Sequence, residues 1–270
     1  MRNLRLDLAY DGTEFYGWQI QPHKPTVQGA IEAAVERITG ERATVTGAGR
    51  TDAGVHAAGQ VACFRTNTPI PCENLNRALN NILPREIRVL RVCEAPAAFH
   101  ARYAAVSKLY RYRILQSNVC PPFLARFVYH KPVRLDVERM MRAAKCIEGE
   151  HDFTSFAASE PRRAKPQTTG RRSAPRSAVR RISFSRVFWR PETSILTYDV
   201  RGNGFLHHMV RNLVGTLIEV GRDAIPPDAI PAILLARRRP EAGPTAPAHG
   251  LCLVRVEYPP TLEFKNCDLD

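Results

Sequence analysis

The chain has 270 residues, 44% of them hydrophobic, and a formal charge of +13 because 39 Lys and Arg residues outnumber 26 Asp and Glu residues. This length and composition predict a globular protein of one large domain or two smaller ones, and the charge favours a polyanionic partner. No apolar run approaches the roughly 18 residues of a membrane span, and the first residues lack a signal sequence. We therefore expect a cytoplasmic protein that does not enter membranes.

The first hundred residues show an alternation of strand and helix patterns. Apolar residues at every second position predict a strand over residues 4–10, and helical spacing predicts a helix over 27–38 with Thr26 as its N-cap. Strand-like residues at 43–66 flank a loop rich in glycine. A helix over 73–83 and a strand over 86–93 follow.

The same order of elements restarts near residue 103. The patterns predict a strand through Tyr110 and Ile114, helices over 135–148, 206–217 and 228–238, and strands over 181–189, 194–201 and 251–258. We therefore predict an α+β fold of two similar halves, residues 1–104 and 105–260, with a tail over 261–270. No fixed-period sequence repeat accompanies this duplication.

Cysteine and histidine spacing argues against disulfides and metal sites. The seven cysteines are scattered and include no Cys-x-x-Cys pair, so we expect neither disulfides nor structural zinc. The histidines show no His-Glu-x-x-His pattern. The side chains of His207 and His208 should diverge on a helix, so no metal site is predicted.

A single carboxylate, Asp52, follows Arg50 by two residues in the glycine- and alanine-rich stretch 47–60. Small neighbours let a bulky ligand approach the backbone, and an adjacent guanidinium favours an ionised carboxylate, which is a candidate nucleophile or base. A surface ion pair in a tight turn explains the spacing equally well. The stretch is not a P-loop, because Val55 and His56 stand where lysine and a hydroxyl are needed, and the dinucleotide-binding pattern fails at Asp52.

Basic residues are concentrated between residues 161 and 190, where ten Lys or Arg residues occur with no acidic residue. Proline and glycine among them predict a loop over 157–180 that contacts phosphate without base specificity. In the strand near residue 110, Lys108, Tyr110 and Tyr112 share one face. The two tyrosines form either a stacking platform for an unpaired base or ordinary strand packing.

Six blocks of residues resemble, in order, the tRNA pseudouridine synthases of the A type. They include Arg-Thr-Asp-Ala-Gly-Val-His around Asp52 and the segments 47–60, 99–102, 108–112, 149–153, 202–212 and 246–251. The resemblance implies the pseudouridine synthase fold, in which two halves share a mixed, largely antiparallel sheet with flanking helices and a central basic cleft. It also implies a homodimer. The chain departs from the family pattern at Lys108, where arginine is common, and in residues 161–180, which are longer and more basic.

The resemblance further implies an isomerase that converts uridine to pseudouridine in the anticodon stem-loop of tRNAs, at positions 38 to 40, on a flipped base and without nucleotide, metal or other cofactor. Asp52 would be the nucleophile, Tyr110 and Arg50 would bind substrate, and Arg102 and Arg211 would support them. Two alternatives stay open. One is a non-catalytic RNA-binding or RNA-folding protein in which Asp52 only anchors Arg50, and the other is a synthase of the same fold that acts on a different RNA.

Overall fold

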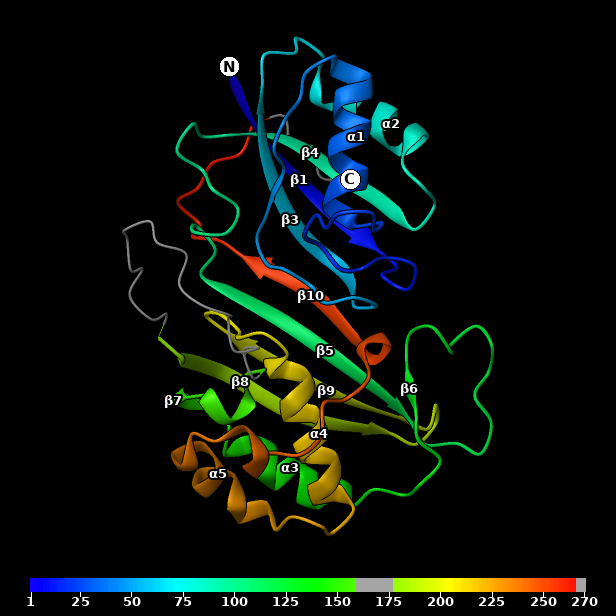
Figure 1. Ribbon diagram of the computed structural model, residues 1–270, viewed down its shortest axis with the longest axis vertical. Coiled ribbons are helices and arrows are strands. Elements are labelled where there is room, and N and C mark those ends of the chain that lie inside the picture. Colours follow the sequence, from blue (N-terminus) through cyan, green and yellow to red (C-terminus); the bar gives the residue numbers. More distant parts are fainter. Residues whose placement is uncertain (159–176, 266–270) are drawn as a thin grey trace.

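The structure is a computed structural model that describes residues 1–158 and 177–265. Within these residues, strands form one 10-stranded sheet in the order β4-β1-β3-β10-β5-β9-β8-β7, with β2 paired to β3 and β6 to β5 (Figure 1). The strands are β1 Arg2–Tyr10, β2 Thr46–Gly47, β3 His56–Thr66, β4 Ile87–Ala95, β5 Ser107–Leu115, β6 Tyr129–His130, β7 Gly149–Asp152, β8 Val179–Arg190, β9 Ile195–Gly202 and β10 Leu251–Glu257. The α-helices are α1 Val27–Thr39, α2 Cys72–Ile82, α3 Val137–Lys145, α4 Met209–Gly221 and α5 Ile230–Ala236.

Strand β10 lies in the middle of the sheet and joins its β4-β1-β3 part to its β5-β9-β8-β7 part. It pairs in parallel with β3, placing Cys252 opposite His56, and antiparallel with β5, placing Leu253 opposite Tyr110. The pairing of β5 with β6 is also parallel, and the remaining pairs are antiparallel. The predicted α+β fold with a mixed, largely antiparallel sheet is confirmed.

Local sequence patterns explain the elements around β1. Leu4, Leu6 and Leu8 are fully buried, because alternate residues of a strand point to the same face. Helix α1 begins where the Thr26 hydroxyl accepts a hydrogen bond from the amide of Gly29, and it ends at Gly40 in the left-handed conformation. Figure 1 shows α1 and α2 beside β1, β3 and β4, and it shows α3, α4 and α5 beside the other end of the sheet.

Helix α4 begins at Met209, three residues later than the apolar spacing predicts. His208, immediately before it, has φ of 59° and cannot continue a right-handed helix. Within the helix, a Cβ on Gly215 would lie 1.6 Å from the carbonyl oxygen of Pro244. The segment that leads to β10 therefore packs directly against the α4 backbone.

Other sequence predictions have mixed outcomes. Between residues 43 and 55 only the two-residue β2 is a strand, and the short β6 and β7 were not predicted. Cys93 is disulfide-bonded, so the expectation of no disulfides is wrong there, because spacing along the chain does not report distance in the fold. Residues 159–176 of the predicted basic loop lie outside the described residues, and the division at residue 104 stays a prediction. Among the described residues, no helix has the length and apolar composition needed to cross a membrane.

Candidate active site

The loop that carries Asp52 is fixed by contacts with β1, β3 and the segment after β1. The amide of Trp18 donates to the carbonyl of Thr51 at 3.1 Å, and the amide of Gly54 donates to the carbonyl of Phe15 at 3.2 Å. Val55 donates back to the carbonyl of Asp52 at 3.1 Å, which closes a turn that includes Gly54 at φ of 75°. A residue with a side chain is strained at this φ, so glycine is required here.

Buried polar side chains of β1 and β3 form hydrogen bonds that support the same loop. The hydroxyl groups of Tyr10 and Thr51 lie 2.9 Å apart, and the Gln60 amide donates to the Tyr10 hydroxyl and to the carbonyl of Gly49, the latter at 2.8 Å. Burial raises the pKa of Tyr10 to about 12. The Tyr10 phenol therefore stays neutral and serves as a hydrogen-bonding support.

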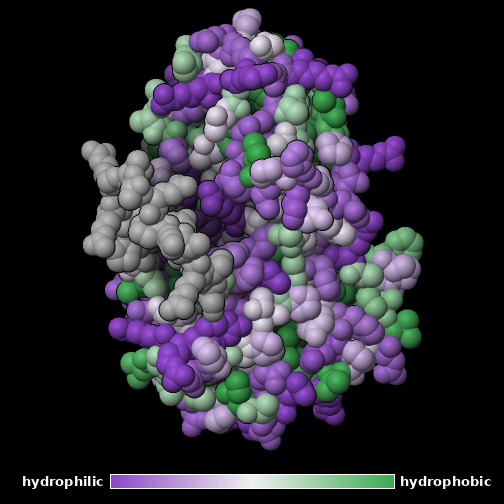
Figure 2. Space-filling view, in the orientation of Figure 1, coloured by the Kyte–Doolittle hydropathy of each residue, from purple (hydrophilic) through white to green (hydrophobic). Residues whose placement is uncertain are grey.

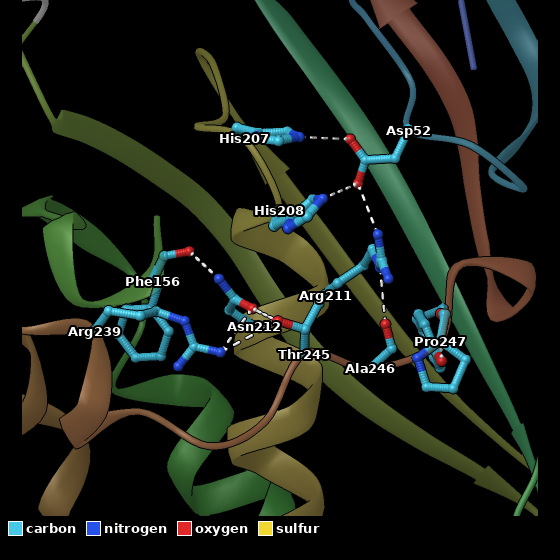
Figure 3. Close-up of polar contacts among 11 residues, drawn as sticks. Asp52, Phe156, His207, His208, Arg211, Asn212, Arg239, Thr245, Ala246 and Pro247 are labelled. Carbon is cyan, nitrogen blue, oxygen red and sulfur yellow. Dashed lines mark hydrogen bonds and ion pairs between the residues drawn. The ribbon is translucent and has the colours of Figure 1, made fainter. Parts of the chain in front are cut away.

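The Asp52 carboxylate faces one guanidinium and two imidazole side chains from the other half of the chain (Figure 3). Arg211 Nη1 lies 3.0 Å from Asp52 Oδ2, His208 Nε2 lies 3.5 Å from the same oxygen, and His207 Nε2 lies 3.6 Å from Oδ1. The Asp52 side chain is 20% exposed, so one side of the carboxylate stays open to a ligand.

The start of α4 positions these partners. Arg211 lies in the first turn, and its Nε donates to the carbonyl of Ala246 at 2.8 Å, which leaves Nη1 directed at Asp52. The next residue, Asn212, is fully buried and joins three segments through bonds to the Phe156 carbonyl, the Arg239 guanidinium and the Thr245 hydroxyl (Figure 3). The amino end of a helix also attracts a negative charge.

The structure separates the predicted site residues into two groups. It brings Asp52, Tyr110 and Arg211 together, but the expected Arg50 to Asp52 ion pair is wrong. Arg50 is exposed and makes no hydrogen bond or ion pair with any described residue. Arg50 and Asp52 are two residues apart in a turn, and their side chains diverge. The guanidinium that contacts the Asp52 carboxylate is that of Arg211. Arg102 is exposed, its guanidinium lies over the ring of Tyr103, and its charge acts on Lys108 rather than on Asp52.

Tyr110 lies on β5 beside the Asp52 loop. Its side chain is 7% exposed, its ring packs edge-on against Phe205 at 5.0 Å, and its hydroxyl would lie 3.7 Å from a Cβ on Gly49. Burial, followed by the nearby Tyr10 and Asp52, raises the pKa of Tyr110. The hydroxyl is therefore protonated, and no described residue forms a hydrogen bond with it.

Lys108 forms a cationic cluster with Arg102 and Arg180 next to Tyr110. The Lys108 side chain runs along Gly49, with Cε 3.5 Å from the position of a Cβ there. Burial and the charges of the two arginines lower the pKa of Lys108 to about 8. No described acidic residue pairs with it, so the cluster suits an anionic ligand. Figure 2 shows hydrophilic residues lining a hollow near the centre of the face that it presents.

The second tyrosine of the predicted platform is a core residue. Tyr112 is fully buried, and its hydroxyl donates to the carbonyl of Pro247 at 2.8 Å.

Sequence reasoning also missed the two histidines, because His207 and His208 were expected to diverge on a helix. The signal was the run Gly202-Asn203-Gly204 before them, which favours an irregular turn and a later helix start.

Comparisons with known proteins point to one family. The family model described as tRNA pseudouridine synthase matches residues 8–104 and 143–259. The protein named tRNA pseudouridine synthase A from Solibacter usitatus is 49% identical over 259 residues, which covers 96% of this chain and 100% of that protein. A protein of the same name from Moorella thermoacetica is 48% identical over 257 residues, covering 94% of this chain and 99% of the relative.

Proposed function

The chain belongs to the tRNA pseudouridine synthase family, and from that premise we propose that it isomerises uridine to pseudouridine in the anticodon arm of tRNAs, at positions 38 to 40. The observation that carries the proposal is the placement of Asp52. Its carboxylate is partly exposed, contacts Arg211 at 3.0 Å, and stands on a loop that is fixed by buried polar contacts. The relatives' names supply the tRNA substrate.

Asp52 acts as the nucleophile in this proposal. The bond between uracil N1 and ribose C1′ breaks, the base turns, and C5 bonds to C1′ in its place. C5 then loses its proton and N1 ends protonated, so the reaction neither oxidises nor reduces the base and needs no co-reactant. Attack at C1′ and addition to the uracil ring both use a carboxylate oxygen that faces the substrate. The Arg211 guanidinium holds that carboxylate in one orientation.

Tyr110 binds the flipped uracil. The base must leave the helical stack to expose its reacting atoms, which costs a few kcal/mol, and a ring beside the nucleophile stabilises the flipped state by stacking. Because burial raises the pKa of Tyr110, its hydroxyl is a donor, and it is free to bind a uracil oxygen.

The cationic cluster of Lys108, Arg102 and Arg180 contacts phosphates that flank the flipped nucleotide. It lies on the same side of the Asp52 loop as Tyr110, as the neighbours of Gly49 indicate. The exposed side chain of Arg50 adds a further cation at the loop itself. Phosphate contacts of this kind position an RNA and carry no sequence information. The family resemblance supports a homodimer, and the tRNA substrate supports a cytoplasmic location.

Tritium release tests the proposal. Unmodified tRNA labelled at C5 of uridine is incubated with the protein, with Asp52→Asn and with Asp223→Asn. The last is a matched control, because Asp223 is exposed and pairs with Arg139. We expect release by the wild type and by Asp223→Asn, and none by Asp52→Asn, with tRNA binding retained. Release by Asp52→Asn would refute the nucleophile, and no release from any tRNA would favour a non-catalytic RNA-binding protein or another RNA substrate.

The modified positions are mapped with tRNA variants. Uridines 38, 39 and 40 are replaced by cytidine one at a time and then together. We expect release to fall with each replacement that removes a substrate uridine and to stop in the triple variant. Full release from the triple variant would refute the anticodon-arm assignment while leaving the isomerase intact.

A further inference from the structure

The imidazoles of His207 and His208 converge on the Asp52 carboxylate. One ligand atom from each of these three residues lies within 4.8 Å of the others. The two rings lie against each other, with centroids 3.9 Å apart. Adjacent residues of a regular helix could not meet in this way, and the left-handed backbone of His208, at φ of 59°, turns the two side chains toward the same carboxylate.

The spacing of these atoms fits a metal coordination shell better than direct hydrogen bonds. Histidine Nε2 lies 3.6 Å from one carboxylate oxygen and 3.5 Å from the other, which is longer than the usual N–H···O distance. Nitrogen and oxygen ligands bind Zn²⁺ at about 2.0–2.1 Å, so two ligands of a tetrahedral ion lie about 3.3–3.4 Å apart. Small side-chain movements would therefore close the shell around an ion.

The site is accessible and has free coordination positions. His207 is 69% exposed and His208 is 31% exposed, so an ion can enter from solvent. Three protein ligands leave at least one position for water, as in catalytic zinc sites. Two imidazoles and one carboxylate favour a transition metal over Mg²⁺, which prefers oxygen ligands. The Arg211 cation beside Asp52 opposes binding of a second cation, so we expect a reversibly bound ion.

We propose that Asp52, His207 and His208 bind a divalent transition-metal cation of the Zn²⁺ class, and that the bound cation blocks the carboxylate from uridine. The site is thus inhibitory: cation and substrate compete for the same oxygen atoms. Cation binding follows from the geometry alone, whereas inhibition rests on the proposed role of Asp52 as nucleophile. Measurements of the two separate the failure of one from the failure of the other.

Binding is tested with Co²⁺, whose visible absorption reports its ligands, in tag-free protein treated with chelator and without tRNA. We expect one equivalent to bind, and His207→Gln and His208→Gln each to weaken binding by about tenfold or more, since even outer-shell changes cost that much. His23→Asn is the matched control. His23 is exposed at φ of 57°, which asparagine tolerates. Undiminished binding in both glutamine variants, no binding at all, or a sulfur-to-cobalt charge-transfer band would overturn the site.

Inhibition is tested with Zn²⁺ in the tritium-release reaction. We expect release by the wild type to fall as Zn²⁺ is added before tRNA, to recover with chelator, and to need more Zn²⁺ as tRNA increases. The concentration for half-inhibition should rise in His207→Gln and stay unchanged in His23→Asn. If Co²⁺ binds as expected and Zn²⁺ leaves release unchanged, the inhibitory role is overturned.

Discussion

Arg211 and Asp52 are 159 residues apart in the chain, and their side chains meet at 3.0 Å. The same guanidinium donates through Nε to the carbonyl of Ala246 at 2.8 Å, so one planar group links the Asp52 loop to the segment before β10. A fork with several donors makes two such bonds at a fixed angle, whereas an ammonium group has no comparable fixed geometry.

Arg211→Lys should lower turnover although the charge is kept. The lysine cannot hold Ala246 and Asp52 in the same arrangement, and a hydrogen bond to a charged group contributes about 1.5–3 kcal/mol, so we expect a loss of about 10- to 150-fold in kcat. Single-turnover tritium release measures it. Arg222→Lys, at the far end of α4, is the control and should act as the wild type. Equal rates for Arg211→Lys and the control would contradict a role for the Arg211 geometry.

Tyr110→Phe and Tyr112→Phe should have opposite effects. The Tyr110 hydroxyl bonds to no described residue, so its removal should change the free energy of unfolding by less than about 0.5 kcal/mol while lowering turnover by about tenfold or more. Removing the Tyr112 hydroxyl loses its bond to Pro247 and should cost about 1 kcal/mol of stability with turnover retained. Urea denaturation measures the stability of both variants, and tritium release measures their turnover. A fully active Tyr110→Phe enzyme would rule out a role for the hydroxyl.

Affinity for tRNA should fall as pH rises above about 8. The pKa of Lys108 is lowered to about 8 by burial and by Arg102 and Arg180, and a bound phosphate raises it again. Binding of tRNA then takes up a proton at Lys108. The contribution of Lys108 to the affinity is therefore fully present below about pH 8, and the affinity falls by about tenfold at about pH 9. Lys108→Arg stays charged and should flatten this dependence. Fluorescence anisotropy at constant ionic strength measures Kd, and parallel pH profiles for the two proteins would contradict the prediction.

Asn212→Ala should destabilise the fold rather than act on the chemistry alone. The change leaves the buried Phe156 carbonyl without its donor and removes the acceptor that Arg239 and Thr245 share, and Asn212 itself is fully buried. We expect the free energy of unfolding to fall by about 2–4 kcal/mol in urea denaturation. Asn203→Ala, on the exposed turn after β9, should lose less than about 1 kcal/mol. Similar losses in the two variants would show that the buried network contributes little.

Strong periodicity made most of the fold predictable. The alternation of Leu4, Leu6 and Leu8 and the spacing of Val27, Ile31 and Val35 correspond to elements with one buried face, and both appear as predicted. Two-residue strands such as β6 carry no such pattern, because neighbours across the sheet define them. The start of α4 was misplaced since apolar residues continue N-terminal to His208, whose backbone conformation ends the periodicity.

The sequence and the family resemblance named Asp52, Tyr110 and Arg211, which the structure brings together, but they did not predict the contacts among these residues. Asp52 stands in a stretch whose small residues mark it, and Tyr110 lies on a strand that the pattern identifies. The partner of Asp52 was misassigned, because Arg50 is close in sequence while Arg211 arrives through the fold. The convergence of His207 and His208 depends on one left-handed residue, which composition and spacing do not encode.

The position of β10 in the sheet determines when, during synthesis, the two parts of the sheet can pair. Among the described strands, β10 alone bridges β3 and β5, although it is made last, at Leu251–Glu257. A ribosome that has reached residue 250 has synthesised both the Asp52 loop and Arg211, yet no strand pairing holds them in register. Chains that end before β10 through a stalled or truncated message thus leave the two halves unjoined, and a competent enzyme is available to RNA only once β10 has been synthesised.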